Sequence, residues 1–94
     1  MTVTVVAKNR AFDTNTIRVP ANSRVTIKLE NKDPDPHNIA VYDTPEAEQE
    51  IFVSDTISGS GSSTSGEFDA PPPGTYFFRC DVHPVTMTGQ LIVE

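Results

Sequence analysis

The stretch SRVTIKLE, residues 23–30, alternates between polar and apolar side chains from Arg24 to its end. Val25, Ile27 and Leu29 share one parity, and charged or hydroxyl-bearing residues occupy the other. A period of two is that of a β-strand with one buried and one exposed face. Asn22 and Ser23 are typical of a turn, because asparagine tolerates a positive φ better than most residues. The stretch therefore predicts a half-buried strand that follows a turn.

Similar short segments recur on both sides of this one, separated by turn residues. Strands are predicted at 2–8, 16–20, 37–42, 51–53, 75–80 and 88–93, with a further extended segment at 66–70. Residues 58–66 are rich in serine and glycine and predict a loop or a weak edge. Thr44-Pro45 resembles a helix start, so one short helix near 45–50 is also expected. About seven to eight short strands predict an all-β fold, an antiparallel β-sandwich.

Length and charge restrict the partners. The 94 residues are enough for one domain, residues 1–94, which we expect to be a monomer. The net charge is −6, and the segment 33–55 holds seven carboxylates and no lysine or arginine. Nucleic acid is not an expected partner, because phosphate binding needs a basic surface. Two interpretations of 33–55 stay open: a solvated acidic loop, or a docking surface for a basic patch on another protein.

The cysteine count and the hydropathy pattern say little about the compartment. A single cysteine cannot close a disulfide within the chain. No apolar run approaches the length of a membrane span, so none is expected. No signal peptide is expected either, since strand-like sequence begins at Thr2.

The segment 80–87, CDVHPVTM, contains residue types that are rare in the rest of the chain. It holds the only cysteine, Cys80, one of two histidines, His83, and one of two methionines, Met87. The other histidine, His37, has the parity of Ile39 and Val41 and should therefore face the core. One thiolate, two imidazoles and a weak thioether form the ligand set of a mononuclear copper centre for electron transfer. The sequence therefore predicts a copper site.

Each of these residues, taken alone, has a structural interpretation. A lone cysteine is usually a small buried hydrophobic residue, and a lone methionine near a strand usually packs in the core. The clustering as Cys-x2-His-x3-Met, with a histidine upstream, favours the metal. Zinc is a weaker candidate than copper, because a thioether is a poor zinc ligand.

At these residues the chain resembles the cupredoxins, and it is most similar to the plastocyanin, amicyanin and pseudoazurin group. The resemblance covers nearly the whole chain, from the early strands through Pro36-His37-Asn38 and the segment 73–80 to the last strand. It implies a Greek-key sandwich and one type 1 copper ion bound by His37, Cys80, His83 and, more weakly, Met87. It also implies that the Asn38 N–H points at the Cys80 sulfur, and that the protein works in the periplasm or otherwise outside the cytoplasm.

The loop departs from the family at one informative position. Many relatives have proline just before the second histidine, whereas this chain has Val82. Proline has no N–H. We therefore expect a second hydrogen bond, from the Val82 N–H to the Cys80 sulfur, that raises the reduction potential.

Four functions compete. The first is a one-electron carrier, free or as a domain of a larger redox protein, that meets redox partner proteins through His83 and an apolar patch around it. The second is a copper storage or delivery protein with the same fold. An enzyme with additional copper is not expected, because both histidines are already used. The fourth, a metal-free scaffold, predicts no colour with copper.

Overall fold

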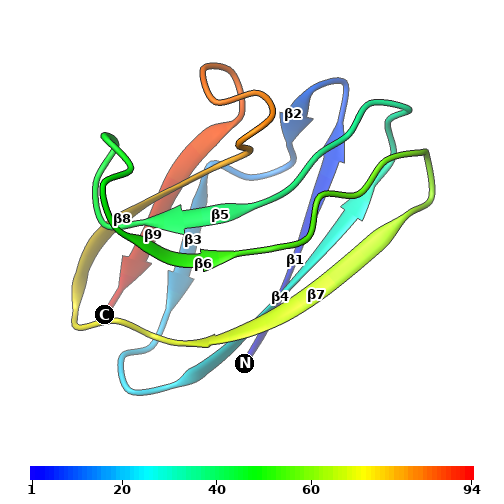
Figure 1. Cartoon of the computed structure of the whole chain (residues 1–94). Helices are drawn as coiled ribbons and strands as arrows, with labels where there is room; N and C mark the ends of the chain where they lie inside the picture. The colour runs from blue at the N-terminus through cyan, green and yellow to red at the C-terminus, as the bar shows by residue number, and fades with distance from the viewer.

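The computed structural model describes residues 1–94 and contains nine β-strands and no helix. One sheet has four strands in the order β2-β1-β4-β7, and the other has five in the order β3-β9-β8-β5-β6. Figure 1 shows the two sheets packed face to face, which confirms the predicted all-β sandwich. The strands are β1 (Thr2–Lys8), β2 (Ala11–Phe12), β3 (Thr16–Val19), β4 (Arg24–Asn31), β5 (Ala40–Tyr42), β6 (Glu50–Val53), β7 (Ser63–Asp69), β8 (Gly74–Arg79) and β9 (Thr88–Val93).

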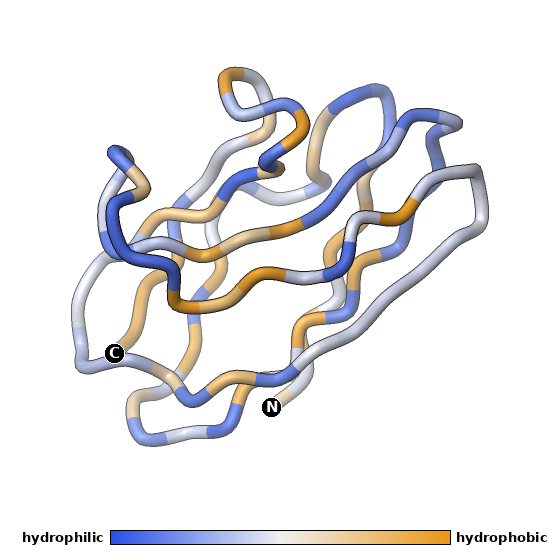
Figure 2. The backbone as a smooth tube through the Cα atoms, in the orientation of Figure 1, coloured by the Kyte–Doolittle hydropathy of each residue, from blue (hydrophilic) through white to orange (hydrophobic).

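The core lies between the sheets and is a single cluster of fifteen buried residues. Val25, Ile27 and Leu29 of β4 belong to it, at 0–1% exposure, as the alternation predicted. The same alternation is visible along β4 in Figure 2, where hydrophobic and hydrophilic residues follow one another. Cys80 and Met87 are also members of this cluster, so the candidate metal ligands lie at one edge of the core.

The sheets are mixed: the sandwich is as predicted, but two of its strand pairs are parallel where antiparallel pairing was expected. β1 pairs with β4 in parallel, and β3 pairs with β9 in parallel. The reason is that the chain crosses to the five-stranded sheet at β3 before it returns as β4. A period-two pattern shows which face of a strand is buried, but it does not show which strand lies beside it.

The short helix predicted near 45–50 is absent. Residues 43–49 form a tight loop between β5 and β6, in which the Asp43 carboxylate accepts from the N–H groups of Thr44 (2.8 Å) and Gln49 (3.0 Å). Ala47 has a φ of 55°, which is incompatible with a continuing helix. The Thr44 hydroxyl makes no hydrogen bond, so it caps nothing.

Of the two alternatives for residues 58–66, a loop or a weak edge, the second holds for the part from Ser63 onward, which belongs to the edge strand β7. β7 begins at Ser63 and pairs antiparallel with β4 along its whole length. Gly66 is needed there for space, because a Cβ atom would lie 2.7 Å from the ring of Phe52. That ring stacks on Phe68 with centroids 5.1 Å apart. A serine- and glycine-rich sequence can therefore form a strand when its small residues make room for a neighbour's aromatic ring.

The arrangement of β5, β8 and β9 positions the candidate site. β8 lies between β9 and β5 in the sheet, and the loop from β8 to β9 closes the end of the sandwich away from both termini (Figure 1).

The structure contains no helix long and apolar enough to cross a membrane.

Candidate metal centre

Cys80 follows β8 directly and begins the loop that carries most of the candidate ligands. It is fully buried and is a free thiol. Its N–H donates to the Met87 carbonyl (2.9 Å), the His83 N–H donates to the Cys80 carbonyl (3.2 Å), and the Met87 N–H donates to the His83 carbonyl (3.1 Å). These backbone bonds fold the loop on itself. Cys80, His83 and Met87, which is 1% exposed, therefore share one compact turn.

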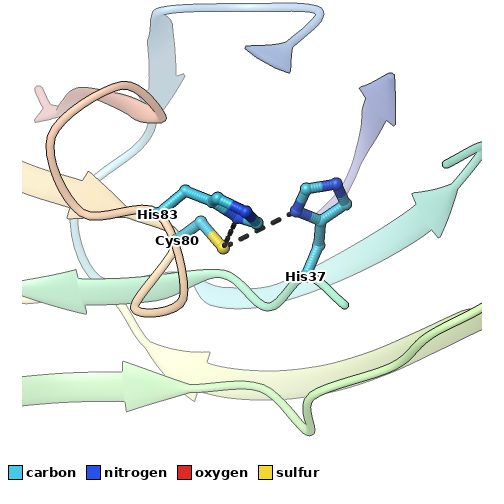
Figure 3. A group of neighbouring side chains, drawn as sticks. All are labelled: His37, Cys80 and His83. Atoms are coloured by element: carbon cyan, nitrogen blue, oxygen red, sulfur yellow. Dashed lines mark hydrogen bonds between the residues drawn. The ribbon is translucent and has the colours of Figure 1, made fainter. Parts of the chain in front are cut away.

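His37 approaches this turn from a distant part of the sequence. It precedes β5 and is held by an isolated bridge, in which His37 and Ile57 exchange two backbone hydrogen bonds of 2.9 Å. Its side chain is fully buried, as its parity with Ile39 and Val41 predicted. Figure 3 shows the imidazoles of His37 and His83 both directed at the Cys80 sulfur.

The spacing of these three side chains is that of ligands around one ion. The Nδ1 atoms of His37 and His83 each lie 3.8 Å from the Cys80 Sγ, and the three donor atoms lie within 4.8 Å of one another. A metal in the plane of three such donors, at about 2.3 Å from sulfur and about 2.0–2.1 Å from nitrogen, holds sulfur and nitrogen about 3.8 Å apart. The chemistry and the spacing of the donors thus fit a soft or borderline metal ion.

Asn38 connects the His37 segment to the loop in the way that the resemblance implied. Its N–H points at the Cys80 Sγ, at 3.5 Å. Its side-chain amide donates to the Asp81 carboxylate (3.1 Å) and accepts from the Asp81 N–H (2.7 Å). These contacts explain why Asn38 is buried although its parity is opposite to that of His37.

Asp81 is a site residue that the sequence analysis missed. Besides Asn38, its carboxylate accepts hydrogen bonds from the Tyr42 hydroxyl (2.8 Å) and the Arg79 Nε (2.9 Å). Burial alone would raise the pKa of Asp81, but the bonds from Arg79, Asn38 and Tyr42 outweigh it and lower the pKa below its usual value. An ionised Asp81 therefore fixes the first residue after Cys80 to β5. In the sequence, the one indication of this role was that Asp81 directly follows the only cysteine.

Asp33 was counted with the acidic segment 33–55, but it is buried. Its carboxylate contacts the His37 Nε2 at 2.8 Å and also accepts from the N–H groups of Asn9 (2.7 Å) and Arg10 (2.9 Å). The bonds from Arg10 and then from His37 hold the pKa of Asp33 at about 2. The signal in the sequence was weak: an acidic residue four positions before a candidate ligand.

The hydrogen bond hypothesised from Val82 is not formed. The hydrogen bond that the Cys80 sulfur accepts from the backbone comes from Asn38, and Val82 is exposed at the outside of the loop. The proposed effect of this residue on the reduction potential therefore has no structural support.

Comparison with known families gives one match over nearly the whole chain. The sequence model of the family described as "Cupredoxin-like domain" matches residues 1–93. A comparison with curated protein sequences found no match.

Solved structures with the same fold include several copper proteins. Auracyanin A, a "blue" copper protein from Chloroflexus aurantiacus, is 23% identical with a TM-score of 0.87, over 100% of this chain and 98% of that one. Dithionite-reduced auracyanin from Roseiflexus castenholzii is 23% identical with a TM-score of 0.87, over 99% and 96%. Amicyanin from Paracoccus versutus is 24% identical with a TM-score of 0.69, over 98% and 80%. At these identities the likeness shows the fold.

Proposed function

Because this chain belongs to the cupredoxin-like domain family, we propose that it is a one-electron carrier with a single type 1 copper ion. The observation that carries the proposal is the placement of two imidazole Nδ1 atoms, each 3.8 Å from one buried thiol sulfur. His37, Cys80 and His83 would hold the ion, with Met87 as a weaker fourth ligand. Bound copper would supply the redox couple, since this ligand set partly suits both Cu(I) and Cu(II).

The surroundings of the ligands support electron transfer rather than substrate turnover. His37 is bound by the Ile57 bridge and by Asp33, and the loop is fixed by Asn38 and Asp81. Ligands held this firmly change position little when the metal changes its oxidation state, and small rearrangement favours fast electron transfer. We therefore propose a protein that moves electrons and carries out no chemistry on a substrate.

His83 is the proposed point at which electrons enter and leave. It is half-buried, and the apolar residues around it are exposed. Val85 is 89% exposed and Val82 is 42% exposed, and the loop from β8 to β9 carries hydrophobic segments at its tip (Figure 2). Pro36 and Pro84 are exposed as well. An apolar rim of this kind suits brief contact with a redox partner.

We propose that the hairpin between β5 and β6 attracts cationic partners. Of the acidic residues at 33–55, Asp33 is buried and Asp35 pairs with Arg10, while Glu46, Glu48, Glu50 and Asp55 are exposed and make no ion pair. Oxidation by a cationic cobalt(III) phenanthroline complex should slow as salt rises, and Glu48→Gln should slow it by about twofold at low salt. Glu30→Gln, the same charge change on the other sheet, is the control. Equal effects of the two variants would favour a merely solubilising role.

The direct test of the copper proposal is to add Cu(II) to the apo-protein and to record visible and EPR spectra. We expect one equivalent of copper to give an intense thiolate-to-copper band and a narrow copper hyperfine splitting. Rapid electron self-exchange together with slow loss of copper would support the carrier function. Ready transfer of Cu(I) to an acceptor would support copper delivery instead, and a colourless product would refute the type 1 site.

Three further points belong to the same proposal. Residues 1–94 form one domain, the domain acts as a monomer, and it works outside the cytoplasm. The match of the family over residues 1–93 supports a single domain. The resemblance to periplasmic cupredoxins supports a location outside the cytoplasm. Sedimentation of the copper-loaded protein measures whether it is a monomer.

A further inference from the structure

The Asp33 carboxylate is buried, with 6% of the residue exposed, and accepts three hydrogen bonds. Two of the donors are the backbone N–H groups of Asn9 and Arg10, which form the two-residue turn between β1 and β2. Both turn residues have positive φ values, of 55° and 56°. This is the conformation of a primed hairpin turn, which arginine rarely adopts. The carboxylate thus stabilises an unfavourable turn at the same time as it contacts His37.

The geometry assigns a single protonation pattern to the His37 ring. An ionised carboxylate only accepts hydrogen bonds, so the Nε2 atom that lies 2.8 Å from it must carry the proton. A neutral imidazole carries one proton, and Nδ1 is then left with a free lone pair. That atom is the one directed at the Cys80 sulfur. Asp33 therefore selects the form of His37 that can bind a metal through Nδ1.

The two histidines differ in this respect. His83 lies on the loop, is half-buried, and makes no hydrogen bond to a carboxylate. Asp33 itself is fixed from behind, because its N–H donates to the Asn31 Oδ1 at 2.9 Å and Asn31 in turn donates to the Asp35 carbonyl at 3.0 Å. Only His37 therefore receives a fixed negative charge, which makes its ring a stronger donor to a cation.

We propose that Asp33 is a positioning residue of the copper site: its carboxylate sets the His37 tautomer and lowers the reduction potential by favouring Cu(II). The second half of this statement rests on the proposed function, and the first half does not. A negative charge behind a ligand stabilises the more highly charged oxidation state. The turn at Asn9 and Arg10 is thereby linked to the metal through one side chain.

The tautomer is measured on the wild-type apo-protein by the 15N chemical shifts of the histidine rings. We expect His37 to carry its proton on Nε2 at neutral pH. A proton on Nδ1 would overturn the proposal, whether or not copper binds. This measurement needs no variant, so it decides the question even where a substitution at Asp33 prevents folding.

The potential is measured on copper-loaded Asp33→Asn, with Asp35→Asn as the matched control. Asp35 lies on the same segment and loses the same charge, but its carboxylate pairs with Arg10 and does not contact His37. We expect Asp33→Asn to raise the ratio of Cu(I) to Cu(II) affinity by about tenfold, or about 59 mV for one electron. Asp35→Asn should change it by less than about threefold. Asp33→Glu keeps the charge and should restore a potential close to the wild-type value.

The two measurements test the role of Asp33 and the proposed function separately. Equal shifts in Asp33→Asn and Asp35→Asn, or no shift in a variant that keeps its blue spectrum, would overturn the role of Asp33 in setting the potential. A wild-type protein that never turns blue would overturn the proposed function instead, while the tautomer result would still stand.

Discussion

Cys80→Ser is expected to abolish the intense visible band of the copper-loaded protein. The band arises from charge transfer between a thiolate and copper, and a serine hydroxyl stays protonated at neutral pH and is a poor soft ligand. Copper affinity should fall by more than about a hundredfold, since even the loss of an outer hydrogen-bond partner costs about 10–100-fold. Visible spectroscopy and a copper titration against a competing chelator measure both effects.

The variant should still fold, which makes the result interpretable. Cys80 is held by its backbone bond to Met87, and a serine Oγ can accept the Asn38 N–H in place of the sulfur. Val82→Ser is the matched control, because Val82 lies in the same loop and is exposed. It should keep its colour. A blue Cys80→Ser protein would show that the thiolate is not a ligand.

Gly89→Ala is expected to destabilise the apo-protein by about 1–3 kcal/mol or more, through overpacking. A Cβ atom at this position would lie 2.3 Å from the Phe78 ring and 2.7 Å from the Asn15 carbonyl. Neither neighbour can withdraw easily. Phe78 is fully buried against Phe12, and the Asn15 carbonyl accepts the Gln90 N–H. Urea unfolding of the apo-protein measures the change in free energy.

Two further variants isolate the cause. Thr88→Ala, an exposed neighbour on β9, should change the unfolding free energy little. Phe78→Leu makes room for the new methyl group, so the double variant should lose less stability than the two single losses added together. Strict additivity would mean that the Phe78 ring is not what the methyl group meets. Because Phe78 lies two residues before Cys80, Gly89→Ala should also alter the copper spectrum.

The buried faces were the predictable part of this fold. Alternation at 23–30 identified the inward side chains of β4, and the shared parity of Phe78 and Cys80 placed the sulfur at the edge of the core. The alternation weakened at 37–42, where every residue is buried. There, polar side chains on the second face bind Asp81, and a hydropathy pattern does not reveal a polar partner 39 or 43 residues away.

The pairing of strands and the role of Asp33 could not be predicted from the sequence. The parallel pairing of β1 with β4 depends on the crossing of β3 to the other sheet. The burial of Asp33 depends on the turn at Asn9 and Arg10, which lies 23 to 24 residues earlier in the chain. A sum of charges does not distinguish a buried carboxylate from an exposed one. Only the fold shows that Asp33 is surrounded by hydrogen-bond donors.

Three of the four proposed donors lie within a single eight-residue loop, and only His37 comes from elsewhere in the chain. An unfolded polypeptide therefore already contains most of a binding site for copper. By linkage, a metal stabilises a native state only through the ratio of its affinities for the native and denatured forms. Copper should thus raise the melting temperature by less than its native affinity alone implies, and His37 is the residue through which folding adds to that affinity.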